Sequence, residues 1–147
     1  MPTLAKHEQW KTRAFDGHLR KHAHTPFAWG THDCCIGAAN AILANTGTDI
    51  ADDFRGKYST EAEAFALIKT VTGGTTVGDA AAHCAAKHGL VEHLHPLMAK
   101  VGDLVVIDNG GTQIAGVVHL NGKHVISVGP EGLIRLPITH ITRSWSV

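Results

Sequence analysis

The order of two kinds of sequence pattern is the feature that most limits how this chain can fold. Before Pro96, apolar residues recur at the spacing of amphipathic helices, and after it short β-type runs alternate with glycine-rich turns. Helices followed by consecutive strands predict an α+β fold, with the N-terminal helices packed on a C-terminal antiparallel β-meander. The length of 147 residues suits one domain, residues 1–147, with a sizeable single core.

The spacing of apolar residues and the positions of Gly and Pro predict where these elements lie. A first helix covers residues 4–24, with a break near Gly17, and Pro26 ends it. The other predicted helices cover residues 34–45, 59–72 and 77–88, and the predicted strands cover residues 101–108, 114–120, 123–128 and 133–136, with a closing edge strand within 137–147. Asn121-Gly122 predicts a two-residue hairpin turn.

The stretch from Pro26 to Cys34 is a candidate for a chemical site. Pro26 and Gly30 keep the backbone out of a helix, and Thr31 or Asp33 can then cap the helix that begins at Cys34. A thiol in the first turn of a helix lies at the positive end of the helix dipole. This position favours the thiolate over the thiol, which makes a cysteine nucleophilic.

Cysteine usage and charge exclude several classes of protein. Three cysteines, two of them adjacent, form no disulfide framework, so reduced thiols and a reducing compartment are expected. An alternative for Cys34 and Cys35 is a purely structural role at a buried helix start, because free cysteine is often buried. Lys and Arg together number 13, as do Asp and Glu, so no nucleic-acid partner is expected. The sequence predicts no membrane span, and residues 1–8 lack the apolar segment of a secretory signal.

A Trp-Gly-x-x-Asp-Cys motif opens the alanine-rich helix, and Gly102-Asp103 opens the glycine-punctuated strands. Together these motifs resemble the NlpC/P60 superfamily, whose members are papain-like cysteine peptidases and amidases of bacterial cell walls. A small phage-associated branch of that superfamily is the closer resemblance, and it covers nearly the whole chain. The matched residues are Trp10, Arg13, Pro26, Phe27, Trp29, Gly30, Asp33, Cys34, Gly47, Arg55, Gly56, Tyr58, Gly102, Asp103, Gly116, Gly132, Leu133 and Trp145.

This resemblance implies a papain-like NlpC/P60 fold and a place at or near a phage tail tip, where such domains could open the cell wall for DNA entry. The implied partners are other tail-tip proteins and the stem peptides of peptidoglycan. The implied location is the virion, assembled in the host cytoplasm. No cofactor is expected.

The catalytic residues of the superfamily transfer only in part. Cys34 matches the nucleophile, with Asp33 before it in a supporting role. The general-base histidine normally begins the second strand, immediately before a small residue and a glycine, and that position is Ile114 here. A third polar group would fall near Ile126, which is also apolar. The papain-like dyad is therefore absent from its usual positions.

Another histidine would have to act as the base for the cysteine. Side chains alternate along a strand, so His124 shares the face of Ile126 and can point toward Cys34, whereas His119 points to the opposite face. His32 lies close to Cys34 in the sequence but can point away from it. His124 is thus the candidate base, with a solvated surface imidazole as the alternative.

Two histidine clusters have ligand-type residues at helical spacing. One contains His18, His22 and His24, and the other surrounds His83 and His88. Zinc needs four ligands, or three and a water, and neither cluster matches a known spacing. Polar side chains on solvated helix faces are the preferred interpretation, and no metal site is expected.

Functions from different classes remain open. The first is a cell-wall peptidase or amidase of a phage tail with Cys34 as nucleophile, which the retained Asp33-Cys34 pair favours. The second is a catalytically decayed structural component of the tail tip or baseplate, which Ile114 at the histidine position favours. A third is a cytoplasmic thiol-dependent amidase unrelated to phages.

Overall fold

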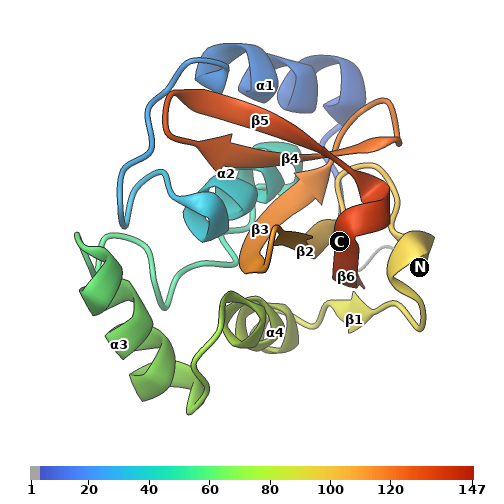
Figure 1. Ribbon diagram of the computed structural model, residues 1–147. Coiled ribbons are helices and arrows are strands. Elements are labelled where there is room, and N and C mark those ends of the chain that lie inside the picture. The colour runs from blue at the N-terminus through green and yellow to red at the C-terminus, as the bar shows by residue number, and fades with distance from the viewer. Residues whose placement is uncertain (1–3) are drawn as a thin grey trace.

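The computed structural model describes residues 4–147 and has the α+β architecture expected from the sequence. Four α-helices precede most of a six-stranded antiparallel sheet (Figure 1). The helices are η1 (Trp10–Phe15), α1 (Asp16–His22), α2 (Cys34–Thr46), α3 (Glu61–Thr72), α4 (Val77–Lys87), η2 (Pro96–Met98) and η3 (Ile138–His140). The strands are β1 (Val91–Glu92), β2 (Leu104–Asn109), β3 (Thr112–Val118), β4 (His124–Gly129), β5 (Gly132–Pro137) and β6 (Ile141–Ser146). Among the helices of residues 4–147, none has the length and apolar character needed to cross a membrane.

The strand order in the sheet is β1-β6-β2-β3-β4-β5, and every neighbouring pair is antiparallel. Strands β2 to β5 form the expected meander. The prediction that the C-terminal strand lies at an edge is wrong, because β6 lies between β2 and the short strand β1. Trp145 of β6 pairs with Leu104 on one side and with Glu92 on the other. The sequence did not predict the edge strand β1, because its two exposed residues are too few to show an alternation of apolar and polar residues.

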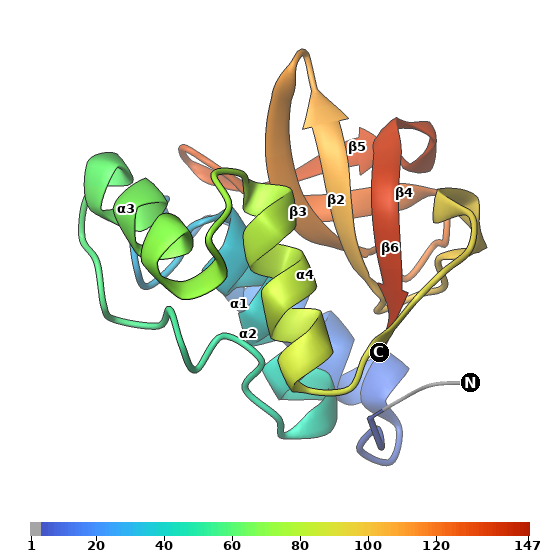
Figure 2. The ribbon, with the colours of Figure 1, turned by 90° about the horizontal axis from the view of Figure 1, so that it is seen from below.

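The sheet is strongly bent, so that it buries apolar side chains on both faces. In Figure 2, β4 and β5 run across the direction of β2 and β6. One face packs against the helices through residues such as Leu104, Val106 and Val117. Residues of the opposite face, among them Val105 and Ile107, pack in a second cluster within the bend of the sheet. Successive apolar residues of β2 therefore point alternately into the two apolar clusters.

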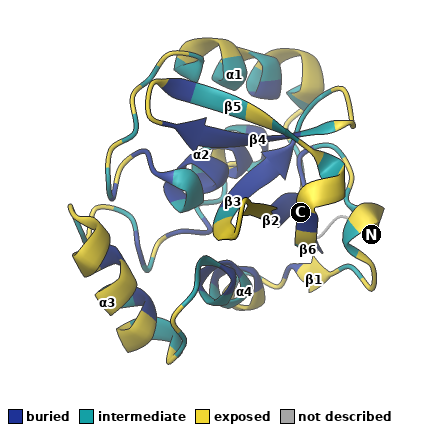
Figure 3. Ribbon diagram, viewed as in Figure 1, coloured by how far each residue is buried: buried dark blue, intermediate teal, exposed yellow. Residues whose placement is uncertain are grey.

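Helix α2 is the most buried helix, and its alanine-rich sequence lets it lie close to the sheet (Figure 3). Gly37 marks the close approach to β4, since a Cβ atom there would lie only 2.4 Å from Cγ2 of Val128. Helix α3 differs, because it exposes its outer side and buries only Ala64 and Ile68. It packs on α4 and forms one border of the cavity described below.

The N-terminal helix is shorter than predicted and has no break at Gly17. It starts as the π-helix η1 and continues directly into α1. Residues five apart lie over one another in a π-helix. This geometry brings the rings of Trp10 and Phe15 together, with centroids 6.2 Å apart, and Phe15 is fully buried.

The connection between β3 and β4 is longer than the predicted two-residue hairpin turn. Residues 119–123 separate the two strands. The side-chain oxygen of Asn121 accepts hydrogen bonds from the backbone N–H groups of Lys123 at 2.8 Å and His124 at 3.1 Å. Asn121 therefore shapes the turn through its side chain, as asparagine often does in loops.

Candidate functional site

Cys34 is the first residue of α2, and Asp33 caps this helix. The Oδ1 atom of Asp33 accepts a hydrogen bond from the backbone N–H of Ile36 at 2.9 Å. Of the two predicted caps, Thr31 and Asp33, the structure selects Asp33. The carboxylate binds one of the free N–H groups of the first turn and places negative charge at the positive end of the helix.

The second oxygen of Asp33 connects this helix start to a distant part of the chain. It accepts hydrogen bonds from the backbone N–H of Gly30, at 2.9 Å, and from the hydroxyl of Tyr58. The backbone N–H of Gly56 donates to the carbonyl oxygen of Gly30 at 2.9 Å. Asp33 is only 2 % exposed, so the motif loop and the loop before α3 are joined through a buried carboxylate.

The role of Tyr58 in this contact could not be read from the sequence. Tyr58 lies 25 residues from Asp33, and among the sequence observations only the proposed resemblance drew attention to it. Burial and the hydrogen bond to Asp33 raise the pKa of the Tyr58 hydroxyl. It therefore stays a neutral donor that holds the carboxylate in place.

Three donors favour the thiolate form of Cys34. The Cys35 thiol lowers the pKa of Cys34 most, and the backbone N–H groups of Ala115 on β3 and of Cys35 lower it further. Burial and the negative charge of Asp33 oppose this effect. The pKa of Cys35 is raised well above its usual value, because its thiol gives its proton to that hydrogen bond and is itself buried. Cys34 is therefore the member of the pair that ionises, and Cys35 is its donor.

Cys34 lies on the wall of an apolar cavity of about 220 Å³. The cavity is bordered by the start of α2, by α3 and α4, and by β3. Large side chains of the wall include Phe27, Trp29, Phe54, Phe65 and Ile68. Cys35 and Cys84 also line it, so all three cysteines of the chain face one space. Burial raises the pKa of Cys84 to about 12, which leaves that thiol protonated.

His124, the candidate base, does not reach this cavity. In residues 4–147 no histidine lines it. His124 is the first residue of β4 and lies four residues before Val128, which does line it. At about 3.4 Å per residue, this separation is about 14 Å along the strand. The ring of His124 instead contacts the side-chain amide of Asn121 at 2.9 Å, so the structure does not bring His124 and Cys34 together.

The residue at the expected histidine position packs mainly on the other side of the sheet. Ile114 borders the cavity and packs against the second apolar cluster. The next residue, Ala115, directs its backbone N–H toward Cys34. Gln113 shares the face of Ala115, but its amide oxygen accepts the N–H of Gly78 at 2.9 Å. None of these side chains is a base for the thiol.

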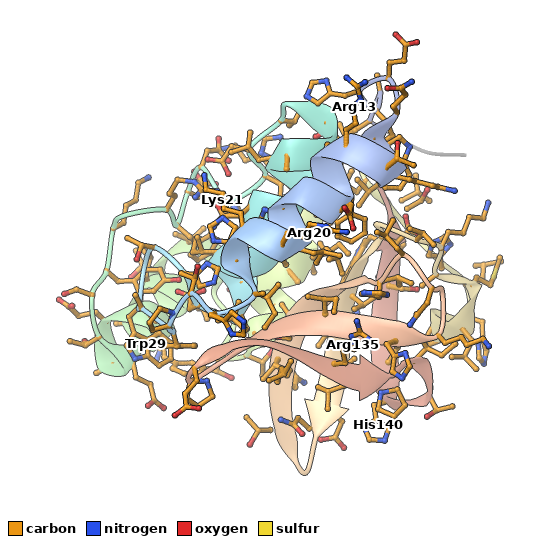
Figure 4. All side chains as sticks on the ribbon, turned by 90° about the horizontal axis from the view of Figure 1, so that it is seen from above. Arg13, Arg20, Lys21, Trp29, Arg135 and His140 are labelled. Atoms are coloured by element: carbon orange, nitrogen blue, oxygen red, sulfur yellow. The ribbon has the colours of Figure 1, made fainter. Side chains whose placement is uncertain are left out.

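A stack of three imidazoles lies beside the loop that leads to Cys34. The ring centroids of His18 and His22 are 4.7 Å apart, and those of His22 and His32 are 5.1 Å apart. His32 is buried, and its Nε2 has no hydrogen-bond partner among the described residues. Figure 4 shows α1, which carries the first two rings, running at an angle toward β5, with Lys21 labelled beside it.

The surroundings of this stack disfavour protonation. Burial, followed by the neighbouring charges of His22, His32 and Lys21, lowers the pKa of His18 to about 4. Burial also lowers the pKa of His22, and repulsion from Lys21 lowers it further. The pKa of His32 is lowered by burial and by repulsion from His22, whereas the charge of Asp33 raises it. The folded protein therefore holds these rings neutral at pH 7.

Acidification is expected to destabilise the fold through this stack. Below pH 6.5 the unfolded chain binds protons at these histidines more readily than the folded protein does, so the free energy of unfolding falls as the pH falls. For His18 alone the loss between pH 7 and pH 5 is about 2 kcal/mol. Urea denaturation at both pH values measures it. His18→Gln should flatten the dependence, whereas the exposed His140→Gln should retain it; equal slopes for both variants would contradict this role.

The other histidine cluster pairs with acidic residues. His83 on α4 contacts Asp53 at 2.8 Å, His88 at the C-cap of α4 contacts Asp52 at 2.9 Å, and Lys87 bridges both carboxylates. These pairs attach the acidic loop to α4. Within the described residues, 4–147, no group of three His, Cys, Asp or Glu side chains is arranged to hold a metal ion.

The comparison with known proteins identifies a family across almost the whole chain. The model of a family described as a domain of unknown function (DUF6950) matches residues 5–147. No curated protein and no solved structure matches the chain. Because the family match covers the helices, the sheet and the Cys34 cavity together, this chain belongs to the DUF6950 family.

Proposed function

We propose that this protein is a peptidase or amidase of the papain-like NlpC/P60 type that acts on cell-wall peptides as part of a phage tail tip. Cys34 is its nucleophile, and Asp33 supports it by holding the start of α2. The proposal places the protein in the virion, assembled in the host cytoplasm. Its partners are other tail-tip proteins and the stem peptides of peptidoglycan.

The position and ionisation of Cys34 carry this proposal. The thiol belongs to the first turn of a 13-residue helix, where the dipole and free N–H groups favour an anion. Donation from Cys35 and from the backbone of Ala115 lowers its pKa further. The same residue lines a cavity in which a substrate group can be held next to the sulfur. These are the conditions that attack of a thiolate on a carbonyl carbon requires.

The second candidate is a catalytically decayed structural component of the tail tip or baseplate. One observation favours it: among residues 4–147, no imidazole lines the Cys34 cavity. Cleavage of an amide requires a proton for the leaving amine, and an imidazole commonly supplies it. The same observation removes His124 from the proposed mechanism.

Zymography on purified peptidoglycan separates the two functions. We expect the wild type to clear the wall and iodoacetamide to block the clearing. Cys34→Ala should lower the rate by on the order of a thousandfold or more. His124→Ala should retain the wild-type rate, because His124 lies about 14 Å along β4 from the cavity residue Val128.

Two outcomes would change the assignment. Undiminished clearing by Cys34→Ala would remove the thiol from the mechanism. Failure of folded wild-type protein to clear the wall, together with tight binding to tail proteins, would establish the structural role.

A further inference from the structure

The cavity beside Cys34 offers little that could bind a charged substrate group. No lysine, arginine or histidine of residues 4–147 lines it. Its buried carboxylate, Asp33, already accepts hydrogen bonds from two backbone N–H groups and from Tyr58. The side-chain oxygen of Gln113 is occupied by Gly78. The other acidic residue of the wall is Glu61, an exposed residue of α3. A carboxylate placed here would lose its hydration without gaining a cationic partner, which is strongly unfavourable.

The cavity does suit an uncharged apolar group of defined size. An apolar cavity of about 150 Å³ in another protein is large enough to bind benzene. The present cavity of about 220 Å³ therefore has room for a phenyl ring or an alkyl chain of about six carbons. Phe54, Phe65 and Ile68 supply the apolar surface against which such a group would pack.

The absence of an imidazole from the described cavity wall limits which carbonyl group the thiolate can attack productively. An amine leaves an amide only when it is protonated, and in the described cavity wall no imidazole is present to supply that proton. A thiolate leaves a thioester as an anion, because the pKa of its thiol is near 8.5. The site thus has what acyl transfer between two sulfur atoms needs.

We propose that Cys34 accepts an apolar acyl group from a thioester donor and that the acyl chain occupies the cavity between α2, α3, α4 and β3. This inference depends on Cys34 being a nucleophile, as in the proposed function, but not on a cell-wall substrate. It assigns the site a substrate class, thioesters of short uncharged carboxylic acids.

The proposed acyl transfer needs no oxidant or reductant. The Cys34 thiolate attacks the thioester carbonyl carbon, and the new carbon–sulfur bond creates an oxyanion. When the oxyanion collapses, the carbon–sulfur bond of the donor breaks and the donor thiol leaves as a thiolate. The acyl group is then a thioester of Cys34. Since no imidazole lines the described cavity wall to activate a water molecule, this adduct is expected to persist.

Intact-mass spectrometry of the full chain with three thioesters of N-acetylcysteamine tests the proposal. The hexanoyl thioester should add one acyl group, which peptide mapping locates at Cys34. It should react at least tenfold faster than the acetyl thioester, which leaves the cavity unfilled. It should also react at least tenfold faster than the glutaryl thioester, which has a similar length but ends in a carboxylate.

A variant that fills the cavity provides a matched control. Ala81 lies on α4 and lines the cavity. Ala81→Phe should slow hexanoyl transfer at least tenfold while labelling of Cys34 by iodoacetamide stays within twofold. If Ala81→Phe does not fold, Ala64→Leu on α3 tests the same wall, and the comparison of the three donors on the wild type needs no variant.

Each outcome decides between the two proposals. Equal rates for the hexanoyl, acetyl and glutaryl donors, or an adduct on Cys35 or Cys84, would overturn the acyl-binding inference. Hexanoyl selectivity without wall clearing would support the inference and reject the cell-wall function. Wall clearing without any acyl selectivity would support the cell-wall function and reject the acyl-binding inference.

Discussion

Replacing Gly30 with alanine is expected to lower the free energy of unfolding by about 4 kcal/mol, the largest effect predicted here for stability. Gly30 has a φ angle of +82°, which is unfavourable for a residue with a Cβ atom. A Cβ at this position would also lie only 2.0 Å from the carbonyl oxygen of Tyr58. Because that oxygen belongs to the backbone, the motif loop and the loop before α3 would have to separate.

Gly56 offers a matched control for this substitution. Its φ angle is +70°, close to that of Gly30, but a Cβ there would have no atom within 4 Å. Gly56→Ala should therefore cost only the conformational part, about 1–2 kcal/mol. Urea denaturation of both variants measures the difference. Equal losses for the two variants would show that the close contact with Tyr58 contributes nothing.

Replacing Asp33 with alanine is expected to lower the free energy of unfolding by about 3 kcal/mol. The variant loses the cap of α2 and leaves the backbone N–H groups of Gly30 and Ile36 without their acceptor. It also leaves the Tyr58 hydroxyl without its partner. Buried donors without acceptors are more costly than the average hydrogen bond is stabilising. Denaturant titration monitored by circular dichroism provides the measurement.

Tyr58→Phe separates the hydroxyl contact from the cap. It removes one donor but leaves both backbone donors on the Asp33 carboxylate, so a loss of about 1 kcal/mol is expected. The charge of Asp33 raises the pKa of Cys34, so labelling of Cys34 by iodoacetamide should be faster in Asp33→Ala than in Tyr58→Phe. If Asp33→Ala were no less stable than Tyr58→Phe, the carboxylate would not hold the helix start.

The sequence predicted the elements of this fold where short-range signals decide them. Asp33, Cys34 and Gly47 mark the start and the end of α2 within a few residues, because capping depends on neighbouring backbone groups. The third helix shows the limit of such signals. The sequence predicted a helix from residue 59, but Thr60 is the cap and the helix begins at Glu61. Both Ser59 and Thr60 can bind Glu63, and only the backbone geometry selects one as the cap.

The surroundings of Cys34 were predictable only in part. The helix dipole and the cap follow from the sequence, and they correctly single out Cys34 as the thiol at the helix start. Nothing in the sequence indicated that Cys35 would lower the pKa of its neighbour Cys34. Alternation predicts that His124 lies on the same face of β4 as Val128, which lines the cavity, but it says nothing about position along the strand. That distance depends on where α2 crosses the sheet, which Gly37 and Val128 determine by their close approach.

By itself, the sequence determined the order of helices and strands, the cap of α2 and a thiol at the start of that helix. Each depends on interactions among residues a few positions apart, so each can be read without knowing the rest of the fold. Only the tertiary structure decided that Tyr58 binds Asp33, that β6 lies inside the sheet and that no histidine of residues 4–147 lines the Cys34 cavity. These features join segments far apart in the chain, and the burial of the whole core, rather than any local preference, selects their alignment.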